Sequence, residues 1–489
     1  MRWVWATIAV LLVLMGVLLL GAINLRPLPS DLETPPTPDL DAVAMLETFR
    51  QGLRIPTISH QPGADGDDSS FADFRSHLLR AYPLTHETLD LERVSDHTLV
   101  FRWEGNEPAL SATVLMAHQD VVPVDQGSEA DWTHPAFGAV VEDGFVWARG
   151  ALDDKLGLFA ILESVESLLR QGFEPRRTLY LVFGHDEELG GPEGASQVAL
   201  LLARRGVEVG LVLDEGGAVT EGQVPGVDQP VALVGVAEKG YMTLLLEVSA
   251  KGGHSSAPPA QTAIGILAQA IARLEADPFD ATLGEVGRAF FERGLGPASP
   301  FGLKLVYGNL WLFEPFLIQI LQANPSTAAM VRTTVAPTII EAGTKENVLP
   351  IRASAFINLR ILPGETQAEV AATVRRTISD PRVRVSFVGD AREPSEASSL
   401  DSAAWATLDL TIREVFPDAV VAPYLVLGGT DSRYFRALCD CVYRFLPVRM
   451  GADSMSLAHG TNERVPVASL AEAVQFYHRL ILNSDAASF

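Results

Sequence analysis

Hydrophobic positions between residues 41 and 236 alternate between short apolar runs and longer amphipathic segments. The runs SATVLMAHQD, RTLYLVFGHDEE and VGLVLDEGG each end directly in polar residues, which is typical of buried strands that lead into functional loops. LGLFAILESVESLLRQG and ASQVALLLARRG have helical spacing and closing glycines. This alternation predicts an α/β fold with a mostly parallel central sheet, whose ligand sites lie at the carboxyl ends of its strands.

The hydrophobic pattern changes after Val236. The segments GYMTLLLEVSAKGG, TAIGILAQAIARLEA, SAFINLRILPG, TQAEVAATVRRTI and VRVSFVG read as strand, helix, strand, helix, strand. We therefore expect a small α+β domain at residues 237–392, inserted between two parts of a catalytic domain at residues 41–236 and 393–489. Residues 277–332 form an apolar excursion that contains NLWLFEPFLIQIL, which suits a greasy substrate group, a buried helix or a subunit contact.

The amino-terminal segment, residues 3–25, carries no charge. A stretch of about 20 apolar residues spans a bilayer core and exceeds the usual apolar region of a cleaved signal. We therefore predict an uncleaved transmembrane signal anchor, with cleavage after Ala22 as the alternative. The catalytic body is expected outside the cytoplasm, in a periplasmic, extracellular or lumenal space. Residues 26–40, RPLPSDLETPPTPDL, suit an extended linker between membrane and body.

Composition excludes several classes of protein. With 489 residues, 47% hydrophobic and 20% charged, the chain fits a globular enzyme of more than one domain rather than a disordered or multi-span protein. The formal net charge of −24 repels phosphate backbones, so nucleic acid is not an expected partner. The two cysteines, Cys439 and Cys441, are read as free thiols or, less simply, as a strained local bridge.

Five segments each place a metal-type ligand after an apolar run. They are MAHQD with His118 and Asp120, GALDDKLG with Asp153 and Asp154, GHDEELGG with Glu187 and Glu188, VLDEGG with Asp214, and AHGTNE with His459. Taken singly, each has an ordinary explanation as a hydrogen-bonded histidine or a solvated acidic turn. Together they fall where an α/β sheet exposes its active loops.

These motifs carry a family resemblance. HxDVVPV, GALDDKLG, DEELGG, DEGG, GGHSSxP and the terminal HGTNE resemble, in order, the dinuclear-zinc amidohydrolases that include aminoacylase, carboxypeptidase S, acetylornithine deacetylase and succinyl-diaminopimelate desuccinylase. The likeness covers residues 45–480, and GGHSSAPP with the long insert is most similar to the branch of carboxypeptidase S and the N-fatty-acyl amino acid hydrolases.

The resemblance implies a two-zinc centre with the following residue roles. Asp153 bridges both ions; His118 and Asp214 complete one site, and Glu188 and His459 complete the other. Histidine nitrogens and carboxylate oxygens are the donors that catalytic zinc prefers, although Co²⁺ or Mn²⁺ could occupy the same ligands.

Three further acidic residues receive roles beside the metals. Glu187 is expected to be the general base, left unligated beside the attacking water. Asp120 is expected to orient the imidazole of His118, because it lies two residues away on the same side of an extended segment. Asp154 is expected to support the turn at Asp153 and is not assigned to a metal.

The resemblance also implies substrate contacts from the small domain and from a later loop. His254 would stabilise the oxyanion, in the family often from the partner subunit. Arg360 would bind the substrate carboxylate, with help from Asn347, and Gly429 and Thr430 would belong to a substrate loop, GGTDSRYF. Each of these residues also has an ordinary structural explanation. A homodimer through the small domain is a family expectation.

The predicted reaction is hydrolysis of the amide bond of an N-acyl amino acid, including fatty-acyl ones, with a free carboxylate. One alternative is a carboxypeptidase or dipeptidase acting on small peptides, and a more remote one is an inactive, membrane-tethered binding protein. The complete ligand set and Glu187 argue against the inactive protein. The sequence shows no HExxH zinc helix and no G-x-S-x-G elbow, so other hydrolase schemes find no support.

Overall fold

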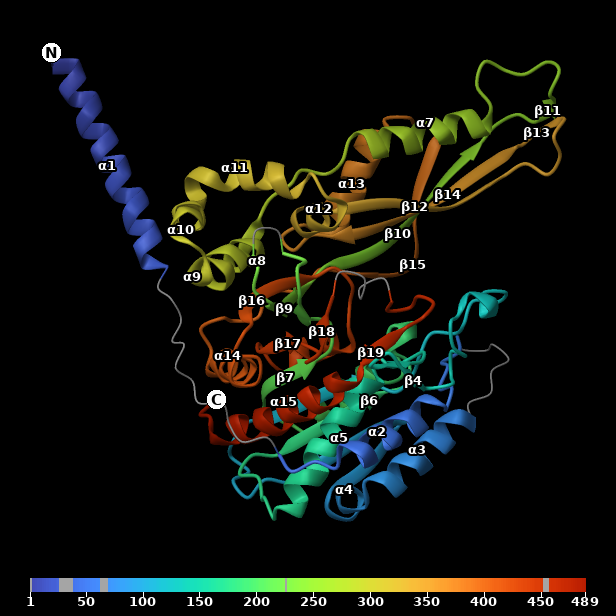
Figure 1. Ribbon diagram of the computed structural model, residues 1–489. Helices are drawn as coiled ribbons and strands as arrows, with labels where there is room; N and C mark the ends of the chain where they lie inside the picture. The colour runs from blue at the N-terminus through green and yellow to red at the C-terminus, as the bar shows by residue number, and fades with distance from the viewer. Residues whose placement is uncertain (1, 26–37, 62–68, 225–226, 452–456) are drawn as a thin grey trace.

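The computed structural model describes residues 2–25, 38–61, 69–224, 227–451 and 457–489. Figure 1 shows a large sheet layered with helices, a smaller sheet above it, and helix α1 projecting from one side. The expected linker at residues 26–40 lies, apart from residues 38–40, outside the described residues. Cys439 and Cys441 are free thiols in this structure.

The large sheet is mixed, so the expectation of a mostly parallel sheet is wrong in part. Strands β6, β3, β7 and β17 run parallel, whereas β1 and β2 form an antiparallel hairpin and β9 runs antiparallel to both β8 and β17. A hydrophobic pattern predicts a strand but not its direction, and this is why the sequence did not show the antiparallel pairings. The sheet comprises β1 (Asp90–Val94), β2 (Thr98–Trp103), β6 (Leu179–Gly184), β3 (Ala112–His118), β7 (Val209–Asp214), β17 (Val442–Arg444), β9 (Val231–Glu238), β8 (Val219–Thr220) and β18 (Arg449–Met450), with β16 (Val420–Val426) paired to β9.

Helices cover both faces of the large sheet, because its central strands are apolar on both sides. All residues of β3 are buried; Leu115 and Ala117 face one helical layer, and Val114 and Met116 face the other. The first layer contains α2 (Ala42–Leu53), α3 (Ser69–Ala81), α4 (Pro83–Thr88), α5 (Lys155–Arg170), α14 (Ala403–Val415) and α15 (Val467–Ala486). The second contains α6 (Ala195–Arg204) and the 3-10 helix η4 (Asp431–Ala437). A small sheet of β4 (Val140–Glu142), β5 (Phe145–Trp147) and β19 (Arg464–Pro466) and the short turns η1 (Glu129–Asp131) and η2 (Glu187–Leu189) complete this part.

The second sheet is antiparallel, in the order β12–β14–β10–β15. Alternate residues of β10, from Met242 to Val248, are buried under helices α7 and α13, which gives this sheet a core of its own. Strand β12 was not expected from the sequence. The elements are β10 (Gly240–Ser249), α7 (Ala263–Ala276), β12 (Thr334–Ala342), β14 (Arg352–Ile361), α13 (Gln367–Ile378) and β15 (Val383–Arg392), and the short strands β11 (Gly253–His254) and β13 (Val348–Leu349) pair at the far tip (Figure 1).

The apolar excursion forms a set of short helices that packs against the large sheet. Its core residues, among them Phe290, Phe291 and Leu310, cluster with Val231 of β9 and Ala422 of β16. These helices therefore extend the core around the large sheet rather than the core of the second sheet. They are α8 (Gly284–Ala289), the π-helical turn η3 (Phe290–Leu295), α9 (Gly296–Ala298), α10 (Phe301–Tyr307), α11 (Leu310–Leu321) and α12 (Pro325–Val331).

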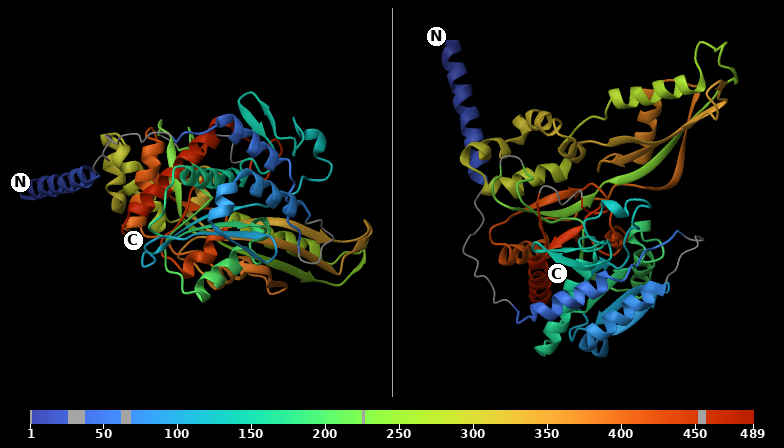
Figure 2. Two further views of the ribbon diagram at one scale, coloured as in Figure 1. Left: turned by 90° about the horizontal axis from the view of Figure 1, so that it is seen from below. Right: turned by 45° about the vertical axis from the view of Figure 1, so that its right-hand side comes forward.

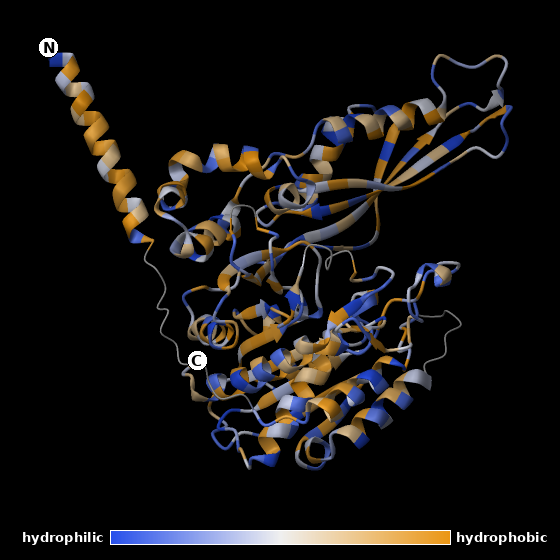
Figure 3. Cartoon of the chain, in the orientation of Figure 1, coloured by the Kyte–Doolittle hydropathy of each residue, from blue (hydrophilic) through white to orange (hydrophobic). Residues whose placement is uncertain are grey.

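Helix α1 (Arg2–Asn24) is, among the described residues, the one helix long and apolar enough to cross a membrane. Its side chains are almost all exposed, and only Ala22 is buried. Figure 3 shows it as a nearly continuous apolar helix. Its last turns contact α10, and the two further views agree on this placement (Figure 2).

Candidate metal centre

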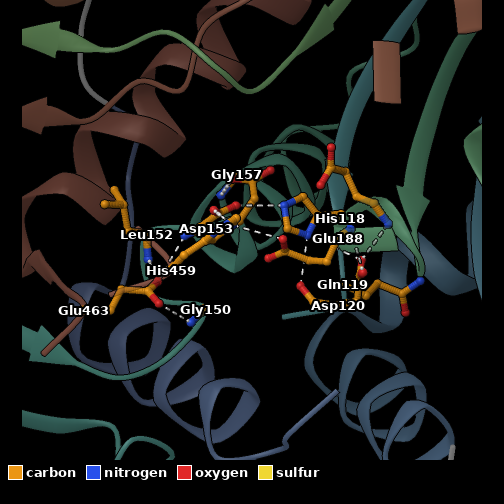
Figure 4. Close-up of polar contacts among 12 residues, drawn as sticks. His118, Gln119, Asp120, Gly150, Leu152, Asp153, Gly157, Glu188, His459 and Glu463 are labelled. Carbon is orange, nitrogen blue, oxygen red and sulfur yellow. Dashed lines mark hydrogen bonds and ion pairs between the residues drawn. The ribbon is translucent and has the colours of Figure 1, made fainter. Parts of the chain in front are cut away.

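Four of the five expected ligands meet at the carboxyl edge of the large sheet. His118 ends β3, and its Nε2 lies 2.9 Å from Oδ1 of Asp153. Nε2 of His459 lies 3.0 Å from Oδ2 of Asp153 and 3.0 Å from Oε2 of Glu188. Asp153 therefore lies between two groups of ligands, with one oxygen toward each histidine (Figure 4).

The fifth expected ligand, Asp214, is not in the cluster, and its neighbour Glu215 takes that place. Ligand atoms of His118, Asp153 and Glu215 lie within 4.8 Å of one another, as do those of Asp153, Glu188 and His459. The Asp214 carboxylate instead accepts a 2.7 Å hydrogen bond from the backbone N–H of Ser432.

Strand alternation explains the exchange between Asp214 and Glu215. Asp214 is the last residue of β7 and shares the face of Val212, which packs with η4 in the second helical layer. Glu215 follows the end of the strand, where its longer side chain reaches the sheet edge. The adjacent acidic pair in VLDEGG offers both candidates, and only the position of the strand end shows which of them reaches the cluster.

The loop that carries Asp153 is held by a residue that sequence reasoning missed, Glu463. Its buried carboxylate accepts hydrogen bonds from the backbone N–H groups of Gly150, Leu152 and Asp153 at 2.8–3.2 Å. Arg149 donates a 2.7 Å charged hydrogen bond to the same carboxylate. Glu463 thus ties the His459 loop to the Asp153 loop, so that ligands about 300 positions apart come from one hydrogen-bonded unit.

Asp120 connects His118 to the turn of the two glutamates. Nδ1 of His118 lies 2.9 Å from the backbone carbonyl of Asp120, which leaves Nε2 directed at Asp153. The Asp120 carboxylate accepts hydrogen bonds from the backbone N–H groups of Glu187 and Glu188 at 3.2 and 3.1 Å, and from the Ser59 hydroxyl at 2.8 Å. Asp120 therefore positions both sides of the cluster through its backbone and its side chain.

Asp154 caps the following helix. Its carboxylate accepts a hydrogen bond from the backbone N–H of Gly157 in the first turn of α5. This contact fixes the direction in which the chain leaves Asp153. The pKa of Asp154 is raised well above its usual value, because the side chain is buried and Asp153 and Asp214 lie nearby.

Glu187 faces the same cluster without a fixed partner. Its carboxylate makes no hydrogen bond to any of the described residues. Burial, together with the carboxylates of Asp431, Glu188 and Asp153, raises the pKa of Glu187 well above its usual value. A carboxyl group without a hydrogen-bond partner, in reach of the ligand cluster, is placed to act as a proton acceptor.

The donor set fits a pair of divalent cations. Asp153, Glu188 and Glu215 bring three negative charges to the site, where two histidines are the neighbouring nitrogen donors. Unpaired buried carboxylates are costly unless they bind cations. Oε1 of Glu188 is buried and has no hydrogen-bond partner among the described residues, as expected for an oxygen reserved for a metal.

Arg360 lies at the base of the second sheet, beside the candidate substrate loop. Its guanidinium lies 4.8 Å from the centre of the Tyr241 ring, and that of Arg392 lies 5.4 Å from the same ring. Gly429 lies against Arg392, since a side chain at Gly429 would begin 3.5 Å from that guanidinium. The backbone N–H and the hydroxyl of Thr430 each donate a hydrogen bond to the Glu238 carboxylate, and these two bonds stabilise the conformation of the loop.

His254 and Asn347 lie together at the tip of the second sheet, away from the cluster (Figure 1). The backbone carbonyl of Asn347 accepts a hydrogen bond from Ser255, and Nδ1 of His254 lies 2.7 Å from the Ser256 hydroxyl. His254 is exposed, and Asn347 is half-buried. Within a single chain, the structure does not bring them to the ligands.

Comparison with known proteins assigns the chain to a family. Residues 114–483 match the model of peptidase family M20/M25/M40. A probable carboxypeptidase S-like 2 of Dictyostelium discoideum is 37% identical over 91% of this chain and 86% of its own length. An N-fatty-acyl-amino acid synthase/hydrolase PM20D1 of Xenopus tropicalis is 39% identical over 90% of this chain and 86% of its own length.

A solved structure shares the fold. The M20 family metallo-carboxypeptidase Sso-CP2 of Sulfolobus solfataricus superposes with a TM-score of 0.67 at 19% identity, over 90% of this chain and 99% of its own. The chain therefore belongs to peptidase family M20/M25/M40, and it is a metal-dependent hydrolytic enzyme that acts on amide bonds.

Proposed function

We propose that this protein hydrolyses the amide bond of N-acyl amino acids that carry a free carboxylate, with two zinc ions in the cluster. The observation that carries the proposal is the convergence of His118, Asp153, Glu188, Glu215 and His459 beside an unpartnered Glu187. Relatives named as N-fatty-acyl-amino acid synthase/hydrolases, at 37–39% identity, support the choice of substrate class.

Asp153 would be shared by both ions, His118 and Glu215 would hold one, and Glu188 and His459 the other. When bound, the pair of zinc ions supplies Lewis acidity, which activates water near neutral pH and polarises the scissile carbonyl. Glu187 accepts the proton of the attacking water and returns it to the nitrogen of the leaving amino acid as the C–N bond breaks. Glu463 and Asp120 hold the loops in place throughout.

The substrate carboxylate would bind the guanidinium of Arg360. Planar guanidinium groups bind carboxylates with two parallel hydrogen bonds, and the contact with the Tyr241 ring holds the Arg360 guanidinium at the base of the sheet. Arg392 adds a second positive charge on the same face. Burial lowers the pKa of Arg360 somewhat, but a guanidinium stays charged at any physiological pH.

The oxyanion donor, His254, would come from a second copy of the chain. A homodimer through the second sheet would leave each tip free to reach the partner's ligand cluster. Strand β12 is an edge of this sheet, and its residues Ile339 and Ile340 are 51% and 61% exposed. Exposed apolar residues on an edge strand are typical of a pairing surface.

Helix α1 would anchor the enzyme in the membrane, with the catalytic body outside the cytoplasm. Its 23 residues correspond to about 35 Å at 1.5 Å per residue, enough to span the hydrocarbon core.

Carboxypeptidase action on small peptides is the second candidate, because relatives of that name match the chain over similar lengths. A panel of N-acyl amino acids of increasing chain length, tested beside dipeptides and N-blocked peptides, separates the two reactions. Preference for acyl amino acids, loss of activity with a chelator and recovery with zinc are expected. Failure to cleave either class with zinc, cobalt or manganese present would contradict the proposal and favour a binding protein.

A further inference from the structure

The outer face of helices α10 and α11 is apolar and uncovered. Trp311, Leu312, Phe316 and Ile320 are 60%, 42%, 59% and 51% exposed, and Phe301 at the start of α10 is 54% exposed. The four-residue spacing of Leu312, Phe316 and Ile320 places these side chains on one face of α11, and Trp311 borders that face. Figure 3 shows the hydrophobic colouring of this helix.

The outer face of α11 carries no charged side chain. Glu314 is the helix's one charged residue, and its side chain is turned toward the body, where it forms an ion pair with Arg288. Gln319 is the remaining polar residue of the helix and lies on the exposed side. A solvated helix would carry charges on its outer face, so this distribution points to an apolar environment outside the protein.

The same helices are fixed to the last turns of α1. Asn309 donates a 2.9 Å hydrogen bond to the backbone carbonyl of Leu18, and Nζ of Lys304 donates one of 3.1 Å to that of Leu25. Gly21 and Gly308 let the backbones approach closely, because a side-chain carbon at Gly21 would lie 2.4 Å from the Gly308 carbonyl oxygen. The membrane depth of α1 thus sets the depth of α11.

The position of this contact along α1 indicates how α11 would lie relative to a membrane. Leu18 lies six residues before the end of the helix at Asn24, which is about 9 Å along its axis at 1.5 Å per residue. Helix α11 begins at Leu310, directly after Asn309. With the end of α1 placed at the membrane surface, α11 would start within the roughly 5–10 Å to which interfacial helices are buried.

We propose that the outer face of α10 and α11 inserts into the same leaflet as the carboxyl end of α1 and forms a second contact with the bilayer. Its occupant is the lipid of that leaflet. The inference rests on the membrane span proposed for α1, and it adds that the catalytic body is held in one orientation against the surface rather than hanging from a linker.

Depth-dependent quenching tests this contact in the full-length protein reconstituted in liposomes. Phospholipids brominated on the acyl chain quench nearby tryptophans, and the difference between wild type and Trp311→Phe isolates the signal of Trp311. We expect that signal to be lost in brominated vesicles and to be protected from aqueous acrylamide. Trp405→Phe is the matched control, since Trp405 packs against Tyr443 within the body.

Quenching of Trp311 by acrylamide, but not by brominated lipid, would overturn the proposal. Protection from both quenchers, with cross-links between two copies through α11, would also overturn it and assign the face to a second chain. Flotation of the protein with the vesicles is measured first. Absence of flotation removes the membrane span itself together with this contact, whereas hydrolysis of a soluble short-chain substrate reports separately on the proposed reaction.

A second measurement does not depend on fluorescence. A protease site placed between residues 26 and 37 allows the linker to be cut after reconstitution. The wild-type body is expected to stay on the vesicles in high salt, and Phe316→Glu is expected to reduce the bound fraction roughly tenfold or more, because a charge in the apolar layer is costly. Leu200→Glu, at a similarly exposed leucine on α6, is the control and should stay bound. Because the contacts between α1 and α10 can also retain the cut body, Phe316→Glu decides: equal retention of wild type and Phe316→Glu, or complete release of the wild-type body, would contradict the second contact.

Discussion

The metal cluster and the tip of the second sheet differ in what surrounds their side chains. His118 and Asp120 are 1% and 0% exposed, and hydrogen bonds from neighbouring loops fix their orientation. At the tip, His254 is exposed and Asn347 is half-buried, and their hydrogen bonds stay within the tip itself. Residues of one chain hold the side chains of the metal cluster in place. The side chains at the tip of the second sheet make no contact with that cluster within the chain. Folding of one chain therefore brings the metal ligands together, whereas the proposed oxyanion donor, His254, would need a second chain to reach them.

Substitution of Glu187 should have the largest effect on turnover. Glu187→Gln keeps the shape of the side chain but cannot accept a proton, so we expect kcat to fall by about 10³–10⁴. Metal content, measured by mass spectrometry, should be unchanged, because Glu187 is not in the ligand groups. Wild-type kcat in this variant would remove Glu187 as the base, and a loss of metal would assign it to the ligands instead.

Substitution of His254 distinguishes an assembled site from one completed by folding. His254→Ala should lower kcat by about 10²–10³, the usual effect of removing an oxyanion donor. Mixing two inactive proteins, His254→Ala and Glu187→Gln, should restore up to about a quarter of wild-type activity, because random exchange of subunits forms hybrid dimers in which one site is intact. No recovery despite proven subunit exchange would place His254 outside the partner's site.

Substitution of Arg360 tests substrate binding at the base of the second sheet, which lies between the metal cluster and the tip. Arg360→Ala should raise KM roughly 10- to 100-fold for substrates with a free carboxylate, since charged hydrogen bonds of this kind contribute about 1.5–3 kcal/mol. Amide derivatives of the same substrates should show no further loss. Arg384→Ala, which removes an exposed arginine on β15, is the control. Equal effects on acid and amide would argue against carboxylate binding.

Glu463 should show the smallest effect, through the loop it holds. Glu463→Gln weakens three backbone hydrogen bonds at Gly150, Leu152 and Asp153, and outer-shell changes of this kind usually weaken metal binding by about 10- to 100-fold. Competition with a chelator measures this affinity. Glu396→Gln is a suitable control on an exposed side chain. Unchanged affinity would mean that the loop keeps its shape without Glu463.

Much of the fold and most of the cluster could be predicted, because both depend on local patterns. Strands β3, β6 and β7 are apolar runs, and the polar residues after such strands gather at one edge of the sheet. His118, Asp153, Glu188 and His459 were found in this way together with the family motifs. The mixed character of the sheet was missed, since the direction of a strand depends on how the chain connects it, and the residues of β1, β2 and β9 do not encode that direction.

The remainder depended on contacts between distant parts of the chain. The choice between Asp214 and Glu215 required the strand end and the Ser432 backbone, which pairs with Asp214. Glu463 acts through hydrogen bonds to backbone groups more than 300 positions away in the sequence, and the pattern of side chains along the sequence does not predict such bonds. The position of Arg360 over Tyr241 followed from the register of β10 and β14.

The most direct test of the account is anomalous diffraction at the zinc edge from crystals of the protein grown with zinc. We predict two peaks that share Asp153, one also contacted by His118 and Glu215 and the other by Glu188 and His459. A single peak, a pair of peaks away from these residues, or coordination by Asp214 in place of Glu215 would contradict it.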